Sequence, residues 1–207
     1  VSDWLDIPEL MPVMLEQKFV PAGRVLFGSG KPKASMINCG LLSVGDSAEE
    51  WSNLLYRTTL ALTKGLGIGV SYDAIRPYGS PIKGSGGTAS GAVSLMQMLN
   101  EVARHVVQGN SLRSALYASL HWKHGDIDRF LAIKDWNDDV KAMKAKHYDY
   151  PAPLDMTNIS VRLDLEWLNQ YYTEQVLDVY GKAHRVFDTA TYQMFSTSEP
   201  GIMYSKD

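Results

Sequence analysis

The chain has 207 residues, of which 45% are hydrophobic and 21% charged, and its formal net charge at pH 7 is −3. This composition is typical of a folded soluble protein, and the length suits one sizeable core in a single domain over residues 1–207. The slight acidic balance excludes a protein that neutralises many nucleic-acid phosphates, and no segment reaches the roughly 18–20 apolar residues of a membrane span. The single cysteine, Cys39, excludes an intrachain disulfide framework and favours a cytoplasmic protein.

The first part of the chain predicts a helical lead-in, a connector and a strand. Residues 4–18 hold apolar residues interrupted by Pro8 and Pro12, so we expect a short helix within a lead-in over residues 1–20. The stretch RVLFGSGKPK is rich in turn residues and is expected to be a connector. Residues 35–44 (SMINCGLLSV) are apolar on both faces, which predicts a strand buried within a sheet.

Two amphipathic helices are expected on either side of a glycine-containing strand. Ser47 and Glu50 have capping-box spacing, so a helix should begin after Ser47 and end at Gly65. Residues 66–72 (LGIGVSY) predict a buried strand. Residues 90–107 carry one apolar stripe at helical spacing and predict the second helix.

The remaining segments continue the alternation of strands and helices. Residues 135–155 interrupt it, because they are polar and poorly periodic and are expected to form an exposed excursion. The other expected elements are strands at SALYASLHW, 158–163 and GIMYS, and helices at DIDRFLAIK, 164–172 and 183–198. This alternation predicts an α/β fold whose sheet can close into a barrel.

A glycine-rich loop with cationic residues precedes the second helix. Residues 79–91 read GSPIKGSGGTASG, and Arg76 and Lys83 supply positive charges there. Exposed amides at a helix N-terminus and cationic side chains both attract phosphate. The loop lacks the Gly-Lys-Ser/Thr of a P-loop, and the alternative of an ordinary flexible surface loop stays open.

Cys39 and a histidine pair are further candidates for chemistry. A free thiol can donate a proton or be oxidised, whereas a lone cysteine in an apolar run is more often a small buried hydrophobe. His121 and His124 are three residues apart and close to Asp126, a pattern that can ligate a metal. Because Lys123 opposes a cation at this place, we assign no metal ligand.

Several segments, taken in order, resemble the large, catalytic subunit of ribonucleotide reductase. NCGLLSVGDS (38–47) resembles the strand that carries one of that family's two redox-active cysteines and leads into an effector-binding Gly-Asp-Ser. LGIGVSYDAIRPYGSPIKG (66–84) resembles its Gly-Ile-Gly strand and first specificity loop, and QGNSLRSAL (108–116) resembles its second. The likeness covers Pro21 to Asp207. It implies the N-terminal part of a ten-stranded α/β barrel of the ribonucleotide reductase type.

The resemblance implies an effector site and a substrate site. A deoxynucleoside triphosphate or ATP effector would place its sugar on Asp46 and Ser47 and its phosphates on Arg76 and Lys83. The ribonucleotide substrate would contact Gly23, Asn38, Cys39, Gly67, Arg113, Ser114 and Ala115. Gly23 departs from the family, which often has a hydroxyl residue near the substrate at that place. We expect Cys39 to lie beside both specificity loops.

The resemblance also implies radical reduction of the ribose. A cysteine thiyl radical takes the 3′ hydrogen, and the 2′ hydroxyl leaves as water, protonated by one thiol of a redox pair that Cys39 matches. The family's radical-bearing cysteine, in an Asn-x-Cys-x-Glu run, and its second redox cysteine come after the segment that ends here at Asp207. We therefore expect an incomplete domain, a fragment or one half of a split enzyme, completed by another chain or by residues not included.

The implied cofactor and partners follow from the same likeness. RPYGSPIKGSGGTASG and LRSALYASLHWKHGDIDRF look more like the adenosylcobalamin-dependent class than the iron-dependent one, although no cobalamin site is identifiable in this segment. The implied partners are a thioredoxin- or glutaredoxin-like reductant and a second copy in a homodimer, with no nucleic acid and no membrane. Two alternatives stay open: a non-catalytic nucleotide-binding or dimerisation module, and an unrelated α/β domain with ordinary turns.

Overall fold

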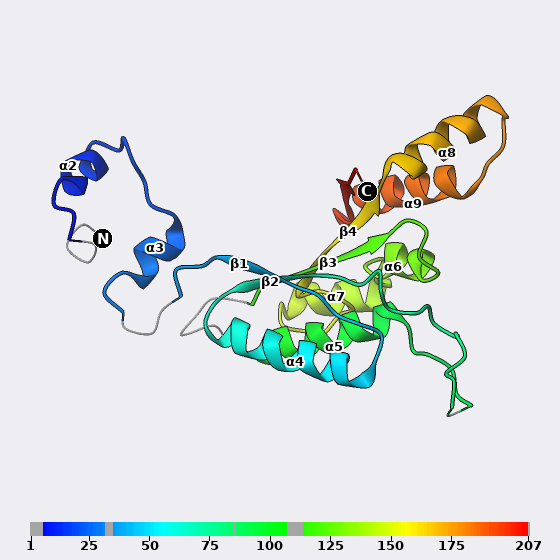
Figure 1. The fold of residues 1–207 in the computed structure, drawn as a ribbon, viewed down its shortest axis with the longest axis horizontal. Helices are drawn as coiled ribbons and strands as arrows, with labels where there is room; N and C mark the ends of the chain where they lie inside the picture. Colours follow the sequence, from blue (N-terminus) through cyan, green and yellow to red (C-terminus); the bar gives the residue numbers. More distant parts are fainter. Residues whose placement is uncertain (1–5, 32–34, 85, 107–113, 207) are drawn as a thin grey trace.

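The fold is that of a computed structural model, which describes residues 6–31, 35–84, 86–106 and 114–206. Five parallel strands form one sheet, and their order in space is their order in the sequence (Figure 1). The strands are β1 (Cys39–Leu42), β2 (Gly67–Ser71), β3 (Leu116–His121), β4 (Thr157–Leu163) and β5 (Gly201–Tyr204). The predicted α/β class is confirmed.

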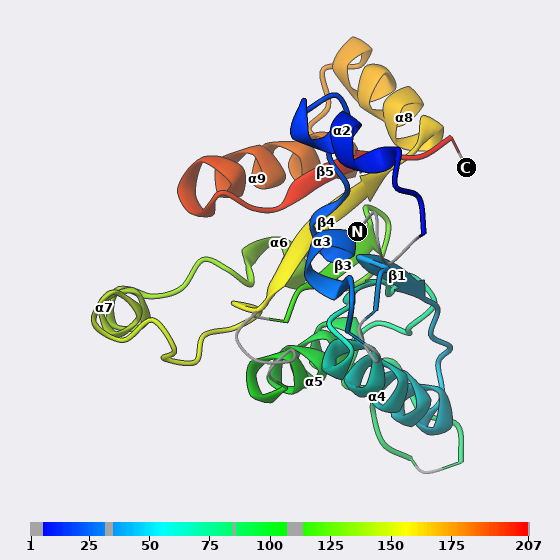
Figure 2. The same cartoon turned by 90° about the vertical axis from the view of Figure 1, so that its left-hand side faces the viewer.

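The helices between the strands cover one face of this sheet. Each crossover advances by one strand in the same direction, and right-handed connections then place every crossover helix on the same side. Figure 2 shows α4 beside α5 at one end of the row, and α8 and α9 near β5 at the other. The helices are α2 (Leu10–Leu15), α3 (Gly23–Gly28), α4 (Ala48–Thr63), α5 (Ala92–His105), α6 (Ile127–Ala132), α7 (Asp138–Lys146), α8 (Leu165–Val176) and α9 (Lys182–Thr197). None of the helices in the described ranges is both long and apolar enough to cross a membrane.

The hydrophobic core lies between the sheet and its helices. Every second residue of β3 and β4 points into it, as the two-residue period of a strand requires. Fully burying one such side chain contributes about 1.5–3 kcal/mol to the free energy of folding. The central core residues are Ile68, Val70, Leu116, Ala118, Leu120, Ile159, Val161 and Leu163 of the strands and Leu95, Met96 and Leu99 of α5.

The opposite face of the sheet is open and carries a mixture of apolar and polar side chains and glycine. Leu41, Gly69, Tyr117 and Asn158 form one row across four strands. Leu41 is 86% exposed, and Asn158 is exposed as well. This open face, uncovered among the described residues, provides the floor of the site described below.

β1 is an edge strand, and the prediction that it is buried within the sheet is wrong. Among the described residues it pairs only with β2, and Cys39 is exposed. Its apolar residues alternate between the helix-covered side and the open face. Composition alone does not separate a strand buried between two others from an edge strand whose outer face is open.

Two other segments differ from the sequence expectations. The predicted connector contains most of α3, whose first turn accepts amide hydrogen bonds at Ala22 O. The predicted excursion contains α7, which begins where the Asn137 side chain accepts a hydrogen bond from Val140 N at 2.9 Å. α7 buries no residue, so it has no apolar stripe that could reveal it in the sequence. The remaining predicted helices and strands are confirmed, including the start of α4 after Ser47.

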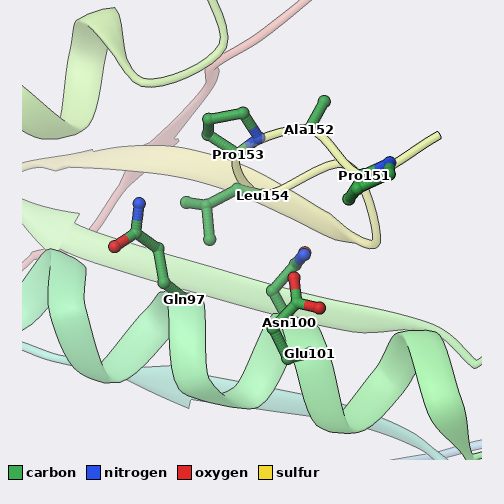
Figure 3. Close-up of a pocket in the computed structure, with 7 residues that line it drawn as sticks. All are labelled: Gln97, Asn100, Glu101, Pro151, Ala152, Pro153 and Leu154. Carbon is green, nitrogen blue, oxygen red and sulfur yellow. The ribbon is translucent and has the colours of Figure 1, made fainter. Parts of the chain in front are cut away.

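A buried carboxylate anchors the end of the excursion to α5. The Asp155 side chain is 1% exposed and accepts hydrogen bonds from Arg104 at 2.6 Å, Lys144 at 2.5 Å and Asn100 at 3.1 Å. Figure 3 shows the preceding loop, residues 151–154, facing α5 across a shallow pocket. These hydrogen bonds and ion pairs hold the loop against the helix. Breaking them is costly, because removing one partner would leave the other charges buried and unpaired.

Acid is expected to weaken this anchor. Burial raises the pKa of Asp155, but hydrogen bonds from Arg104 and Lys144 outweigh it and lower the pKa from 3.8 to about 2. A depressed folded-state pKa stabilises the fold above the unfolded value, and that contribution is lost as pH falls through the folded value. The free energy of unfolding should therefore fall between about pH 4 and pH 2.

Urea titrations across this pH range test the prediction. Asp155→Asn should flatten the profile, although Glu174, whose pKa is also about 2, leaves part of the slope in place. Asp139→Asn, at an exposed position of α7, is the matched control and should keep the wild-type slope. A wild-type slope in Asp155→Asn would show that protonation of Asp155 does not cause the loss of stability in acid.

Candidate functional site

A pocket of about 360 Å³ lies on the open face, at the amino-terminal ends of β1, β2 and β3. We call it the sheet-face pocket. A Cβ placed on Gly67 would lie 3.5 Å from Cys39 Sγ and 3.5 Å from Ala115 O, so these three residues meet at one point. Its lining residues are Cys39, Gly40, Leu41, Gly67, Ile68, Gly69, Ala115, Leu116, Tyr117 and Asn158.

Glycines give this pocket its shape. With no side chain at Gly67 or Gly69, the backbone of β2 is bare where it lines the pocket, so a flat ligand can approach the strand closely. Leu41 and Tyr117 stand on either side of Gly69, 2.8 Å and 3.4 Å from the position a Cβ would take there. The thiol, the bare strand and the start of β3 therefore form a single surface.

The other four residues predicted for the substrate site do not appear among the lining residues of this pocket. Asn38 accepts a hydrogen bond from Gly67 N through its carbonyl at 2.8 Å. Ser114 is buried and donates its hydroxyl hydrogen to Val106 O at 2.6 Å instead of facing the pocket. Gly23 begins α3, which Figure 1 shows beyond the amino-terminal ends of the strands. Arg113 lies outside the described residues.

A second pocket, of about 470 Å³, lies beyond the carboxyl ends of β1 and β2. We call it the hairpin pocket. Arg76 Nε donates a hydrogen bond to Asp46 Oδ2 at 2.5 Å across it. The Ser47 side chain accepts a hydrogen bond from Glu50 N at 3.1 Å and so serves as the N-cap of α4. The lining residues are Asp46, Ser47, Ala48, Trp51, Arg76, Ile82, Thr88, Ala89, Ser90 and Gly91.

The glycine-rich loop forms one wall of the hairpin pocket. Pro81 and Thr88 pair as an antiparallel bridge, and Ile82 N donates to Gly87 O at 2.9 Å, so the loop is a short hairpin. Lys83 lies on this hairpin, outside the lining of the pocket. The structure therefore brings Asp46, Ser47 and Arg76 together and leaves Lys83 at the periphery.

The first amide of α5 is not free for an anion, contrary to the expectation. Asp126 Oδ2 accepts the hydrogen bond from Ala92 N at 2.8 Å, so a carboxylate of the protein already occupies this position. Sequence reasoning missed this role of Asp126 and the presence of Trp51 in the wall. The buried Trp51 Nε1 has no hydrogen-bond partner among the described residues.

The two pockets lie at opposite ends of β1, so the expectation that Cys39 lies beside both loops is only half right. Cys39 lines the same pocket as Ala115 of the second loop, whereas Figure 1 shows the hairpin at the far end of the sheet. α5 connects them: Gly91 of the hairpin pocket precedes the helix, and Val106 at its other end holds Ser114. A rigid helix thus links the two sites.

The two histidines do not form a metal site in the described structure. His121 Nε2 lies 2.8 Å from Asp164 Oδ2, while His124 Nε2 lies 2.6 Å from Ile75 O. Among the residues the structure describes, no three or more His, Cys, Asp or Glu side chains are grouped to hold a metal ion.

The profile of the ribonucleotide reductase barrel domain matches residues 37–152, more than half of the chain. The chain belongs to this family. This span contains the thiol, the hairpin pocket, α5 and every lining residue of the sheet-face pocket except Asn158. The prediction that the chain forms part of the ribonucleotide reductase α/β barrel is confirmed.

Individual relatives agree with this assignment. The vitamin B12-dependent ribonucleoside-diphosphate reductase of Thermoplasma acidophilum is 27% identical over 202 residues, which cover 93% of this chain and 25% of that protein. A ribonucleoside-diphosphate reductase large subunit of Plasmodium falciparum is 36% identical over 129 residues, 61% of this chain and 16% of that protein. The chain thus spans a quarter or less of these two relatives.

A solved structure shows the same fold. The alpha subunit of the class Id ribonucleotide reductase of Actinobacillus ureae superposes with a TM-score of 0.76, over 96% of this chain and 32% of that chain, at 17% identity. Because the barrel-domain profile matches more than half of the chain, the alternative of an α/β domain unrelated to ribonucleotide reductases is wrong.

Proposed function

We propose that the chain forms part of a catalytic subunit that reduces ribonucleotides to deoxyribonucleotides under the control of a deoxynucleoside triphosphate. The observation that carries this proposal is the sheet-face pocket, where the single cysteine of the chain meets bare glycine backbone within the barrel domain. The substrate would lie over Gly67 with its ribose toward Cys39. Asn38 and Ala115 would border it.

Cys39 would act as a proton donor and as one half of a redox pair. Replacing the 2′ carbon–oxygen bond by a carbon–hydrogen bond takes two electrons and two protons, which two thiols supply as they become a disulfide while the hydroxyl leaves as water. The sequence contains one cysteine, so the second thiol and the radical-bearing cysteine must come from outside residues 1–207. A thioredoxin- or glutaredoxin-like dithiol would then reduce the disulfide after each turnover.

The radical source we propose is adenosylcobalamin, supported by the B12-dependent relative from Thermoplasma acidophilum. When bound, this cofactor supplies the radical that starts the reaction. We assign none of the described residues to the cofactor.

The hairpin pocket would hold the effector. Arg76 would exchange its bond to Asp46 for the effector phosphates, because guanidinium and phosphate form strong charge-assisted hydrogen bonds. Asp46, released in this way, would accept hydrogen bonds from the sugar, with Ser47 beside it. Lys83 would reach the phosphates from the hairpin.

Thermal unfolding tests the effector site. A deoxynucleoside triphosphate at about 100 times its Kd should stabilise the protein by about 2.7 kcal/mol, which raises Tm by roughly 5–10 °C. Arg76→Ala should abolish this rise, and Lys83→Ala should reduce it only partly because Lys83 lies outside the lining. Arg57→Ala, at an exposed position of α4, is the matched control. An undiminished rise in Arg76→Ala would refute the phosphate clamp.

A non-catalytic nucleotide-binding or dimerisation module is the second candidate. The exposed apolar residues Tyr56 and Leu60 of α4 and Met98 of α5 favour it, because two copies could bury them against each other. This candidate predicts nucleotide binding and self-association without ribonucleotide reduction, even when the rest of the barrel is supplied.

A further inference from the structure

We propose that Asp126 is a positioning residue of the effector site. Its carboxylate holds both ends of the hairpin together, and the hairpin pocket then has the shape that binds a deoxynucleoside triphosphate. This inference rests on the proposed function, because it concerns the affinity of the same pocket. Asp126 comes from the turn between β3 and α6, outside the lining of the pocket itself.

One buried carboxylate joins the two ends of the hairpin. Asp126 is 2% exposed. Its Oδ1 accepts a hydrogen bond from Tyr78 N at 2.9 Å, and its Oδ2 accepts one from Ala92 N at 2.8 Å. Tyr78 comes directly before hairpin residues 79–91, and Ala92 comes directly after them. The positive end of the α5 dipole further stabilises the negative charge at this position.

The backbone around the carboxylate leaves no room for another arrangement. Gly91 has φ +82°, and a Cβ there would overlap Asp126 Oδ2 and lie 2.7 Å from Tyr78 N. A Cβ on Gly125 would lie 2.6 Å from Pro77 Cγ. Glycines are therefore required on both sides of the contact, and the turn and the hairpin base fit directly against each other.

Two residues close to Asp126 in the sequence contact the segment that leads into the hairpin. His124 Nε2 lies 2.6 Å from Ile75 O, and its Nδ1 accepts a hydrogen bond from Asp126 N at 3.0 Å. The Arg129 guanidinium lies 4.3 Å from the centre of the Tyr78 ring, within the range of a cation–π contact. The turn thus fixes the segment just before and just after Arg76 as well as the hairpin.

Fixing the hairpin affects binding because the hairpin supplies half of the pocket. Ile82, Thr88 and Ser90 line it from the hairpin, opposite Asp46 and Trp51 of the other wall. A ligand that binds only the closed hairpin has an apparent affinity reduced by the fraction of molecules that are closed. Closing the hairpin in advance removes that loss, as preorganisation does in general.

Asp126→Asn changes one contact and keeps the size of the side chain. The amide NH₂ of asparagine is a donor, so it opposes either Tyr78 N or Ala92 N, and one end of the hairpin loses its acceptor. If about one molecule in ten then has the hairpin closed, the affinity for the nucleotide falls about tenfold.

The experiment measures the Kd of each of the four deoxynucleoside triphosphates by titration calorimetry. The protein is prepared with the rest of its barrel, as one polypeptide or as co-expressed chains. The matched control is Asp164→Asn. Asp164 is also a buried carboxylate, accepting hydrogen bonds from Trp167 N at 2.7 Å and Trp122 Nε1 at 3.0 Å at the start of α8, away from the hairpin pocket.

Both variants should unfold at lower temperature, but only Asp126→Asn should weaken nucleotide binding, by about tenfold. Equal affinities in Asp126→Asn and wild type would overturn the inference, as would an equal loss in Asp164→Asn. If Asp126→Asn fails to fold, Arg129→Gln, an exposed change that removes the contact with Tyr78, should still weaken binding a few-fold, and unchanged binding there would overturn it. A wild-type protein that binds none of the four nucleotides would refute the effector site itself.

Discussion

Replacing Cys39 by serine is expected to abolish repeated ribonucleotide reduction by the assembled reductase, meaning this chain together with the rest of its barrel. Serine keeps the size of the side chain but neither forms a disulfide nor donates a proton as readily as a thiol. Loss of the proton donor alone should cost about 10²–10⁴-fold in rate. The measurement is deoxyribonucleotide formed per enzyme with a dithiol reductant in excess.

Effector binding provides the control for this variant. The hairpin pocket lies at the other end of β1, so Cys39→Ser should keep the wild-type rise in Tm with a deoxynucleoside triphosphate. A folded variant with normal nucleotide binding and no repeated turnover would show that the thiol is needed for the reaction and not for the stability of the fold. Wild-type turnover in Cys39→Ser would remove this thiol from the mechanism.

Gly67→Val is expected to block the sheet-face pocket while the fold remains intact. The Cβ position lies 3.5 Å or more from Cys39 Sγ and Ala115, so the first carbon fits, and valine suits a strand. The two added methyl groups would then occupy the bare strip of β2 over which the substrate ribose would lie. Misfit of this kind costs about 1–3 kcal/mol, so kcat/KM should fall by about fivefold to 150-fold.

Gly40→Ala is the matched control for Gly67→Val. Gly40 borders the sheet-face pocket only through its backbone, because a Cβ on it would lie 3.6 Å from Ile68 Cδ1, an ordinary contact on the helix-covered side of the sheet. This variant should keep nearly wild-type kcat/KM. If Gly67→Val were equally active at equal stability, the substrate would not lie over β2 and the assignment of the sheet-face pocket would be wrong.

Local patterns predicted most of the regular structure. The start of α4 could be predicted because Ser47 caps the helix and Glu50 follows at the spacing of a capping box. α5 could be predicted because its buried residues recur at helical spacing. α7 could not, because it buries nothing and therefore leaves no periodic signal.

The sites needed information that local patterns do not contain. Cys39 and Gly67 are neighbours because β1 pairs with β2 in one register, and only the family resemblance indicated that pairing in advance. The exposure of Cys39 was missed because an edge strand with an open apolar face has the same composition as a buried one. Asp126 was missed because its partners, Tyr78 and Ala92, are distant in sequence and no spacing rule connects them.

We propose that this chain supplies the thiol and the effector pocket of a ribonucleotide reductase. The most direct measurement is conversion of ribonucleotide to deoxyribonucleotide by the chain with the rest of its barrel, with and without adenosylcobalamin and deoxynucleoside triphosphates. We expect product only when both parts of the barrel and the cofactor are present, at a rate that the triphosphate changes. An assembly that binds both nucleotides at the two pockets yet forms no deoxyribonucleotide, with this or any other radical source, would contradict it.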